Sequence, residues 1–114
     1  MTNTEKIKIV TNLAKLVFFL TNSTNWCRFA YQRNNGFCLL GAISFLFKGD
    51  DITKMKNYLL NELPIFIESK KLIINTGEYP LNLATFNDNV PHSIVWLFLK
   101  KTYEKLLLEI DNNL

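Results

Sequence analysis

The 114-residue chain is long enough for one folded domain and too short for two. Its content of 48% hydrophobic and 13% aromatic residues provides ample core material and excludes a disordered chain. The net charge of +3 comes from scattered lysines and only two arginines, which disfavours nucleic-acid binding, because that function needs a concentrated basic face.

Cysteine content and hydropathy predict where the protein resides. Cys27 and Cys38 are too few for a disulfide scaffold. The N-terminal residues lack the pattern of a signal peptide, and the longest apolar stretch, residues 37–47, is far shorter than the roughly 20 residues that a membrane span needs. We therefore expect a cytoplasmic protein with reduced thiols and no membrane segment.

The first predicted element is a helix over residues 4–20. Thr2 and Glu5 have the spacing of a capping box, and the polar cluster 21–25 ends the helix. Its expected apolar stripe, widened by Leu13 and Leu20, consists of Ile7, Val10, Ala14, Val17 and Thr21.

Residues 26–37 alternate weakly and include Asn35-Gly36, a tight-turn signal, so a short extended segment or hairpin is expected there. A buried helix over residues 38–47 follows, and Lys48-Gly49 ends it. Its core face is predicted to comprise Leu39, Ala42, Ile43 and Leu46. We expect Gly41 and Ala42 to let the final helix pack closely.

The C-terminal half contains two more predicted helices. Asp50 or Asp51 caps the first, whose stripe of Ile52, Met55 and Leu59 ends at Pro64. Residues 65–83 show no clear pattern. The last helix begins near Pro91-His92-Ser93, with Ser93 as N-cap. Its predicted stripe, broadened by Trp96, Phe98, Tyr103 and Leu107, consists of Val95, Leu99, Thr102, Leu106 and Ile110. The predicted fold is mainly α, a single compact domain over residues 1–114 with four to five helices.

Cys38 raises the question of nucleophilic catalysis. Papain-like cysteine peptidases and acyltransferases place a cysteine at the start of a buried helix, where the helix dipole and a histidine lower the thiol pKa. Cys38 precedes His92 in the chain, and Asp88 or Asn87 could orient the imidazole. The alternative is a small buried side chain that only packs, and we favour it because no sheet to carry His92 is evident.

The stretch "TFNDNVPHS", residues 85–93, is the most unusual polar segment. Asn87 and Asp88 are typical of turns in which side chains accept from backbone N–H groups. Together with His92 they could instead bind a small ligand. Trp26 has two interpretations, an exposed anchor for a protein partner or a core aromatic, and we favour the core. One histidine and two distant cysteines predict no metal site, and no cofactor is indicated.

Several of these residues together resemble a family of small uncharacterised bacterial and phage proteins, a domain of unknown function. The resemblance covers roughly residues 6–107, and the matching positions are Trp26, Cys38, Gly41, Ala42, Phe86, Asn87, Asp88, His92 and Val95. It implies a helix at Val95 but no established activity.

The preferred functional hypothesis is a non-enzymatic module that binds a protein. By analogy with other small phage or mobile-element proteins, the partner would be a host protein, such as an immune-system component, that the chain modulates or inhibits. The alternatives are a thiol enzyme using Cys38 and His92, and a small-ligand domain around Asn87, Asp88 and His92. Self-association stays open.

Overall fold

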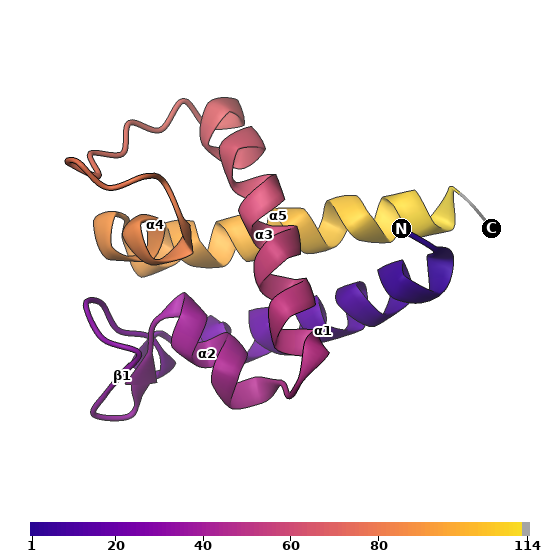
Figure 1. Ribbon diagram of the computed structural model, residues 1–114, viewed down its shortest axis with the longest axis horizontal. Helices are drawn as coiled ribbons and strands as arrows, with labels where there is room; N and C mark the ends of the chain where they lie inside the picture. The colour runs from indigo at the N-terminus through magenta and orange to yellow at the C-terminus, as the bar shows by residue number, and fades with distance from the viewer. Residues whose placement is uncertain (113–114) are drawn as a thin grey trace.

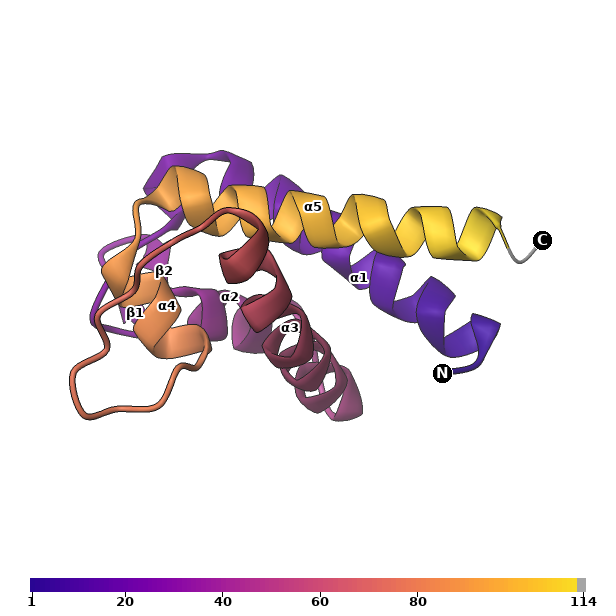
Figure 2. The ribbon, with the colours of Figure 1, turned by 90° about the horizontal axis from the view of Figure 1, so that it is seen from above.

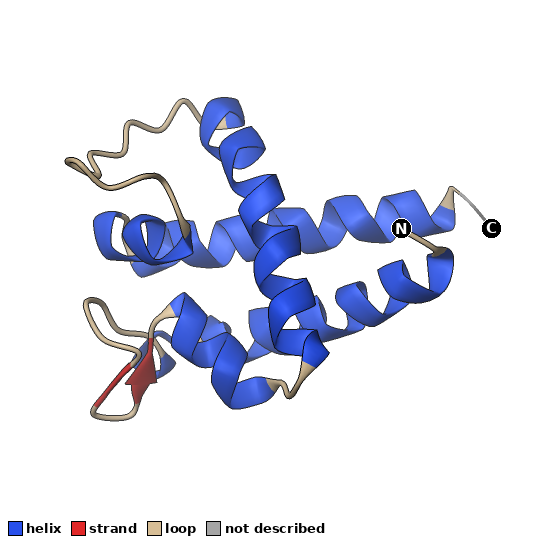
Figure 3. Cartoon of the chain, in the orientation of Figure 1, coloured by secondary structure: helices blue, strands red, loops and turns tan. Residues whose placement is uncertain are grey.

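The structure is a computed structural model that describes residues 1–112. Within them it is mainly helical with one small hairpin, as predicted (Figures 1 and 3). The helices are α1 (Asn3–Thr21), α2 (Leu39–Leu46), α3 (Asp50–Ser69), α4 (Leu83–Asn89) and α5 (His92–Asp111), with a 3-10 turn at Ser23–Asn25 and strands β1 (Gln32–Arg33) and β2 (Gly36–Phe37).

The most extensive contact between two elements joins α1 and α5. α1 and α5 run side by side in opposite directions, and α3 crosses them (Figures 1 and 2). The shorter elements α2, α4 and the hairpin gather at the end where α5 begins. All five helices contribute side chains to one hydrophobic core, as the α5 stripe illustrates: Val95, Leu99, Thr102, Leu106 and Ile110 are all buried, as predicted.

Helix α1 begins at its predicted cap but buries a different face. Thr2 Oγ1 accepts the backbone N–H of Glu5 at 3.1 Å, which confirms the capping residue. The predicted stripe is partly wrong, because Ile7, Ala14 and Thr21 are exposed. The buried residues are Ile9, Val10, Asn12, Leu13, Leu16 and Leu20. Apolar side chains lie on more than one face of this helix, so periodicity alone did not fix its orientation.

The hairpin occurs where it was expected, with its turn one residue earlier. Arg33 pairs with Gly36, so Asn34 and Asn35 form the turn, and Asn34 has a positive φ of 55°. Gly36 lies in β2 instead. A Cβ there would come within 2.6 Å of the Trp26 carbonyl oxygen, so this position requires glycine because the backbone of residue 26 passes close to it.

Gly41 also serves a close approach, but not to the final helix as predicted. A Cβ on Gly41 would lie 2.0 Å from the carbonyl oxygen of Tyr31. The neighbour is therefore the backbone of the segment before the hairpin. Cys38 is the N-cap of α2, and its backbone N–H donates to the same Tyr31 carbonyl at 3.2 Å.

Three predicted helix boundaries are wrong. α3 continues through Pro64 to Ser69, since the exposed Pro64 lies on the outer face, where water can satisfy the freed carbonyl. Its N-cap is Gly49, while Asp50 and Asp51 lie in the first turn. α5 begins at His92, with Pro91 rather than Ser93 as its N-cap. In each case backbone geometry and packing overrode the usual signal.

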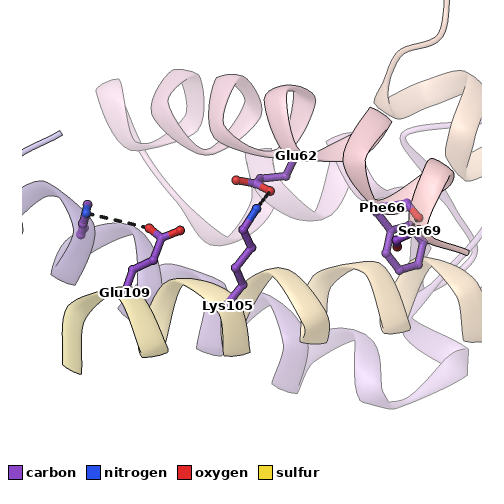
Figure 4. Close-up of polar contacts among 6 residues, drawn as sticks. Glu62, Phe66, Ser69, Lys105 and Glu109 are labelled. Carbon is purple, nitrogen blue, oxygen red and sulfur yellow. Dashed lines mark hydrogen bonds and ion pairs between the residues drawn. The ribbon is translucent and has the colours of Figure 1, made fainter. Parts of the chain in front are cut away.

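Surface ion pairs join α5 to its neighbours. Lys105 Nζ lies 2.9 Å from Glu62 Oε2 on α3, and Glu109 lies 3.9 Å from Lys6 Nζ on α1 (Figure 4). Such partly exposed pairs contribute about 0–1 kcal/mol each. None of the helices within residues 1–112 is long and apolar enough to cross a membrane.

Candidate functional site

Asn87 links three segments of the chain. It is fully buried in α4, a helix that the sequence did not predict. Its Oδ1 accepts from the indole Nε1 of Trp26 at 2.6 Å and from the backbone N–H of Leu39 at 3.0 Å. Its Nδ2 donates to the Cys27 carbonyl at 3.1 Å and to Asp88 Oδ1 at 3.2 Å. We call these five residues the Asn87 network, in which every bonding position of the amide is used.

Asp88 and Arg28 also join the end of α4 to residues 28–29, from the surface side. Asp88 Oδ1 accepts the backbone N–H of Phe29 at 2.9 Å, where the chain has a positive φ of 65°. Arg28 Nη2 donates to the carbonyl of Val90, which ends α4. The guanidinium also lies 5.3 Å from the centre of the Trp26 ring. The strained turn at Phe29 is thus fixed from both sides.

Asn87 and Asp88 accept backbone N–H groups, as the turn interpretation required. The N–H groups belong to Leu39 and Phe29, however, which lie 48 and 59 residues away in the chain. The prediction that Asn87 and Asp88 cap a local turn is therefore wrong. They attach α4 to the segment before α2.

Trp26 and His92 lie together, and both are engaged in packing. Their rings are 5.7 Å apart, and Trp26 packs half-buried against the core. His92 Nε2 is hydrogen-bonded to the Leu20 carbonyl. Because a carbonyl oxygen can only accept, that nitrogen carries a proton. This placement supports the core interpretation of Trp26 over the exposed anchor.

Cys38 is held as a protonated helix cap. Its side chain is buried, and its sulfur accepts the backbone N–H of Gly41 at 3.3 Å. Burial raises the pKa of the Cys38 thiol above its usual value, although the Gly41 bond opposes that shift. The described residues include no hydrogen bond between Cys38 and His92. The thiol-enzyme hypothesis stays a prediction, and this geometry supplies neither a lowered pKa nor a paired base.

A shallow hollow of about 240 Å³ lies beside these residues. Cys38 and Asp88 line it together with Tyr31 and Phe29, whereas Asn87 and His92 do not. The predicted ligand set of Asn87, Asp88 and His92 is thus divided between this hollow and the interior. Across residues 1–112 no group of three or more His, Cys, Asp or Glu side chains is placed to hold a metal ion.

Comparison with protein-family models, with curated proteins and with solved structures found no match to this chain. The resemblance to the small bacterial and phage family stays a prediction.

A surface that the sequence did not indicate carries exposed aromatic rings. Phe19, Phe37 and Phe45 contact one another, with ring centres 4.6 to 5.8 Å apart. Phe18, beside Phe19 on α1, is 84% exposed, and Phe45 on α2 is 62% exposed. Tyr31 and Phe37 border the same hollow as Phe45. We call these five residues the aromatic surface.

Two hollows flank the aromatic surface. One, of about 630 Å³, is lined by Phe18, Phe19 and Lys15 among others, and the second, of about 340 Å³, by Tyr31, Phe37 and Phe45. Their only charged lining residue is Lys15. Sequence reasoning missed this surface because an exposed phenylalanine looks like a core residue in a chain with nine of them.

Native Cys38 is expected to react with iodoacetamide at least about tenfold more slowly than Cys38 in the urea-unfolded chain. The raised pKa lowers the thiolate fraction at any given pH, and burial limits access. Peptide mass spectrometry at several times would give the rate at Cys38 separately from that at Cys27. Alkylation at the unfolded rate near neutral pH would contradict this expectation and favour the thiol enzyme.

Proposed function

We propose that this chain is a non-enzymatic protein-binding module that docks its partner on the aromatic surface. The observation that carries the proposal is the exposure of Phe45, within the cluster of touching rings, and of Phe18, which lines a hollow together with Phe19 of that cluster. Clustered exposed apolar side chains mark interaction sites, whereas isolated ones need no explanation.

Burial of these rings by a partner would be strongly favourable. Each phenylalanine side chain taken from water contributes about 1.5–3 kcal/mol. Phe19 and Phe37 already pack against their neighbours, so the surface is preformed and loses little side-chain entropy on binding. The flanking hollows give room for apolar side chains of the partner.

The charge around this surface indicates the partner's chemistry. No Asp or Glu occurs between Lys6 and Gly49, although this stretch holds six Lys and Arg residues and supplies the whole aromatic surface. Lys15 lines the larger hollow and forms no ion pair within the described residues. A partner segment that combines aromatic or aliphatic side chains with carboxylates would therefore be complementary.

A displayed library of random peptides tests this proposal directly. We expect selected peptides to combine acidic with aromatic or aliphatic residues. Their affinity should fall at least about tenfold for the double variant Phe18→Ser, Phe45→Ser, because two anchors are lost. Ile73→Ser is the matched control, since Ile73 is 98% exposed but lies in the connection between α3 and α4. Circular dichroism would verify that the variants fold.

Two results would overturn the proposal. One is equal enrichment of the same peptides on the double variant. The other is a wild-type dimer in sedimentation that Phe18→Ser, Phe45→Ser abolishes, which would assign the aromatic surface to a second copy of this chain.

The finer proposal is that the partner is a host protein whose action the chain inhibits. It rests on the analogy with other small phage proteins and on the aromatic surface. Once a peptide sequence has been selected, host proteins that contain it can be assayed with wild type and the double variant. Inhibition by both to the same extent would contradict a role for this surface.

A further inference from the structure

Asn12 is a polar residue on the apolar face of α1. It is only 8% exposed and lies between Ile9 and Leu13 on the buried stripe. Its side-chain amide has no hydrogen-bond partner within residues 1–112. The amide atoms themselves reach solvent, since Arg28 Nε is the one fully buried side-chain nitrogen or oxygen without a partner within residues 1–112. The core therefore does not require an asparagine at this position.

Asn12 borders a pocket between the first turns of α1 and α3. The pocket has a volume of about 150 Å³, and the buried Ile9 and Met55 give it an apolar wall. The charged lining residues are two acids and two lysines. Among them, Lys8 and Asp51 form an ion pair of 3.1 Å between the helices. The pocket thus has no net charge to attract an ion.

The size and lining of this pocket indicate what fills it. A cavity of this volume accommodates a single benzene-sized ring. Polar residues such as Thr4 border the pocket as well as the apolar Ile9 and Met55. A few polar groups beside apolar side chains are the arrangement typical of sites that fix the orientation of a small molecule.

We propose that this pocket binds a small neutral molecule of about one six-membered ring that carries one hydroxyl or amide group, and that Asn12 pairs with that group. The ring would pack on Ile9 and Met55. None of the residues that line this pocket belongs to the aromatic surface, so the inference is independent of the proposed function.

Phenol and toluene are suitable probes, because they share a ring and differ in the hydroxyl. Titrated into the isotope-labelled chain, phenol should shift the amide resonances of residues 8–12 and 51–55 saturably. Its affinity should be at least about tenfold above that of toluene. In Asn12→Leu this preference should disappear through loss of phenol affinity. Asn57→Leu, on the exposed face of α3, should bind both probes like wild type.

Phenol shifts that stay linear up to its solubility limit would overturn the proposal. So would equal affinities of wild type for phenol and toluene, or an undiminished preference in Asn12→Leu. Met55→Phe provides a second variant, because the larger ring occupies the pocket and should remove binding of both probes.

Discussion

Asn87→Ala is expected to lower the free energy of unfolding by at least about 3 kcal/mol. The substitution leaves the buried Leu39 N–H and the partly buried Trp26 indole N–H and Cys27 carbonyl without their partner. Each unsatisfied buried group costs about 1–3 kcal/mol. Urea unfolding followed by circular dichroism measures the difference.

Asn89→Ala is the matched control for this effect. Asn89 lies in the same helix, but it is exposed and bonds only the Thr85 carbonyl within α4. Its loss should change stability by no more than about 0.5 kcal/mol. Asn87→Asp should also be destabilised, because it loses the donor and places a carboxylate beside Asp88. That repulsion should weaken as the pH falls and one carboxyl group binds a proton. Equal stability of Asn87→Ala and Asn89→Ala would show that the Asn87 network does not hold the fold.

Gly41→Ala is expected to destabilise the fold by about 3 kcal/mol and to lower Tm by roughly 12 °C. In an ordinary helix interior the same change stabilises by about 0.5–1 kcal/mol. Here the new Cβ would lie 2.0 Å from the Tyr31 carbonyl oxygen, so a backbone segment must move. Its movement would also break the bond from the Cys38 N–H to that carbonyl. A thermal melt shows directly whether the substitution raises or lowers Tm.

Ser44→Ala separates this clash from helix propensity. Ser44 is exposed on the same helix, so its replacement should leave Tm unchanged or raise it slightly. A Gly41→Ala chain as stable as wild type would mean that the segment at Tyr31 yields without cost.

Elements with a single long apolar face could be predicted from the sequence. The stripe of α5 is the clearest example, because Val95, Leu99 and Leu106 recur at helical spacing and all are buried, even though Leu107 and Leu108 on the same helix are exposed. On α1 the same reasoning chose Ile7 and Ala14, which are exposed, since apolar side chains occur around much of that helix. Periodicity predicted the presence of both helices, but it predicted the buried face correctly only for α5.

The remaining features depend on contacts between distant segments. α4 is short, and its buried Asn87 looks like a turn residue until Leu39 and Trp26 are placed beside it. No local pattern encodes a bond across 48 or 61 residues. A proline usually ends a helix. Pro64 is tolerated inside α3 because it faces outward.

For the candidate site, too, the sequence indicated residue types but not the contacts between distant segments. The sequence singled out Trp26, Cys38, Asn87 and His92 as candidates, and the structure brings Trp26 to both Asn87 and His92. Their bonds are internal to the fold, which residue type alone does not reveal. Phe18 and Phe45 carry the proposed interaction, and only burial distinguishes them from core phenylalanines such as Phe86 and Phe98.

The pairing of the first helix with the last has a consequence for synthesis. During translation α1 is made well before α5, the helix with which it makes its most extensive contact. Contacts between segments so far apart in the chain carry a large loop-closure cost and form late. The nascent chain therefore exposes Leu13, Leu16 and Leu20 until α5 has left the ribosome, and a chain stalled before His92 would be a substrate for chaperones and proteases.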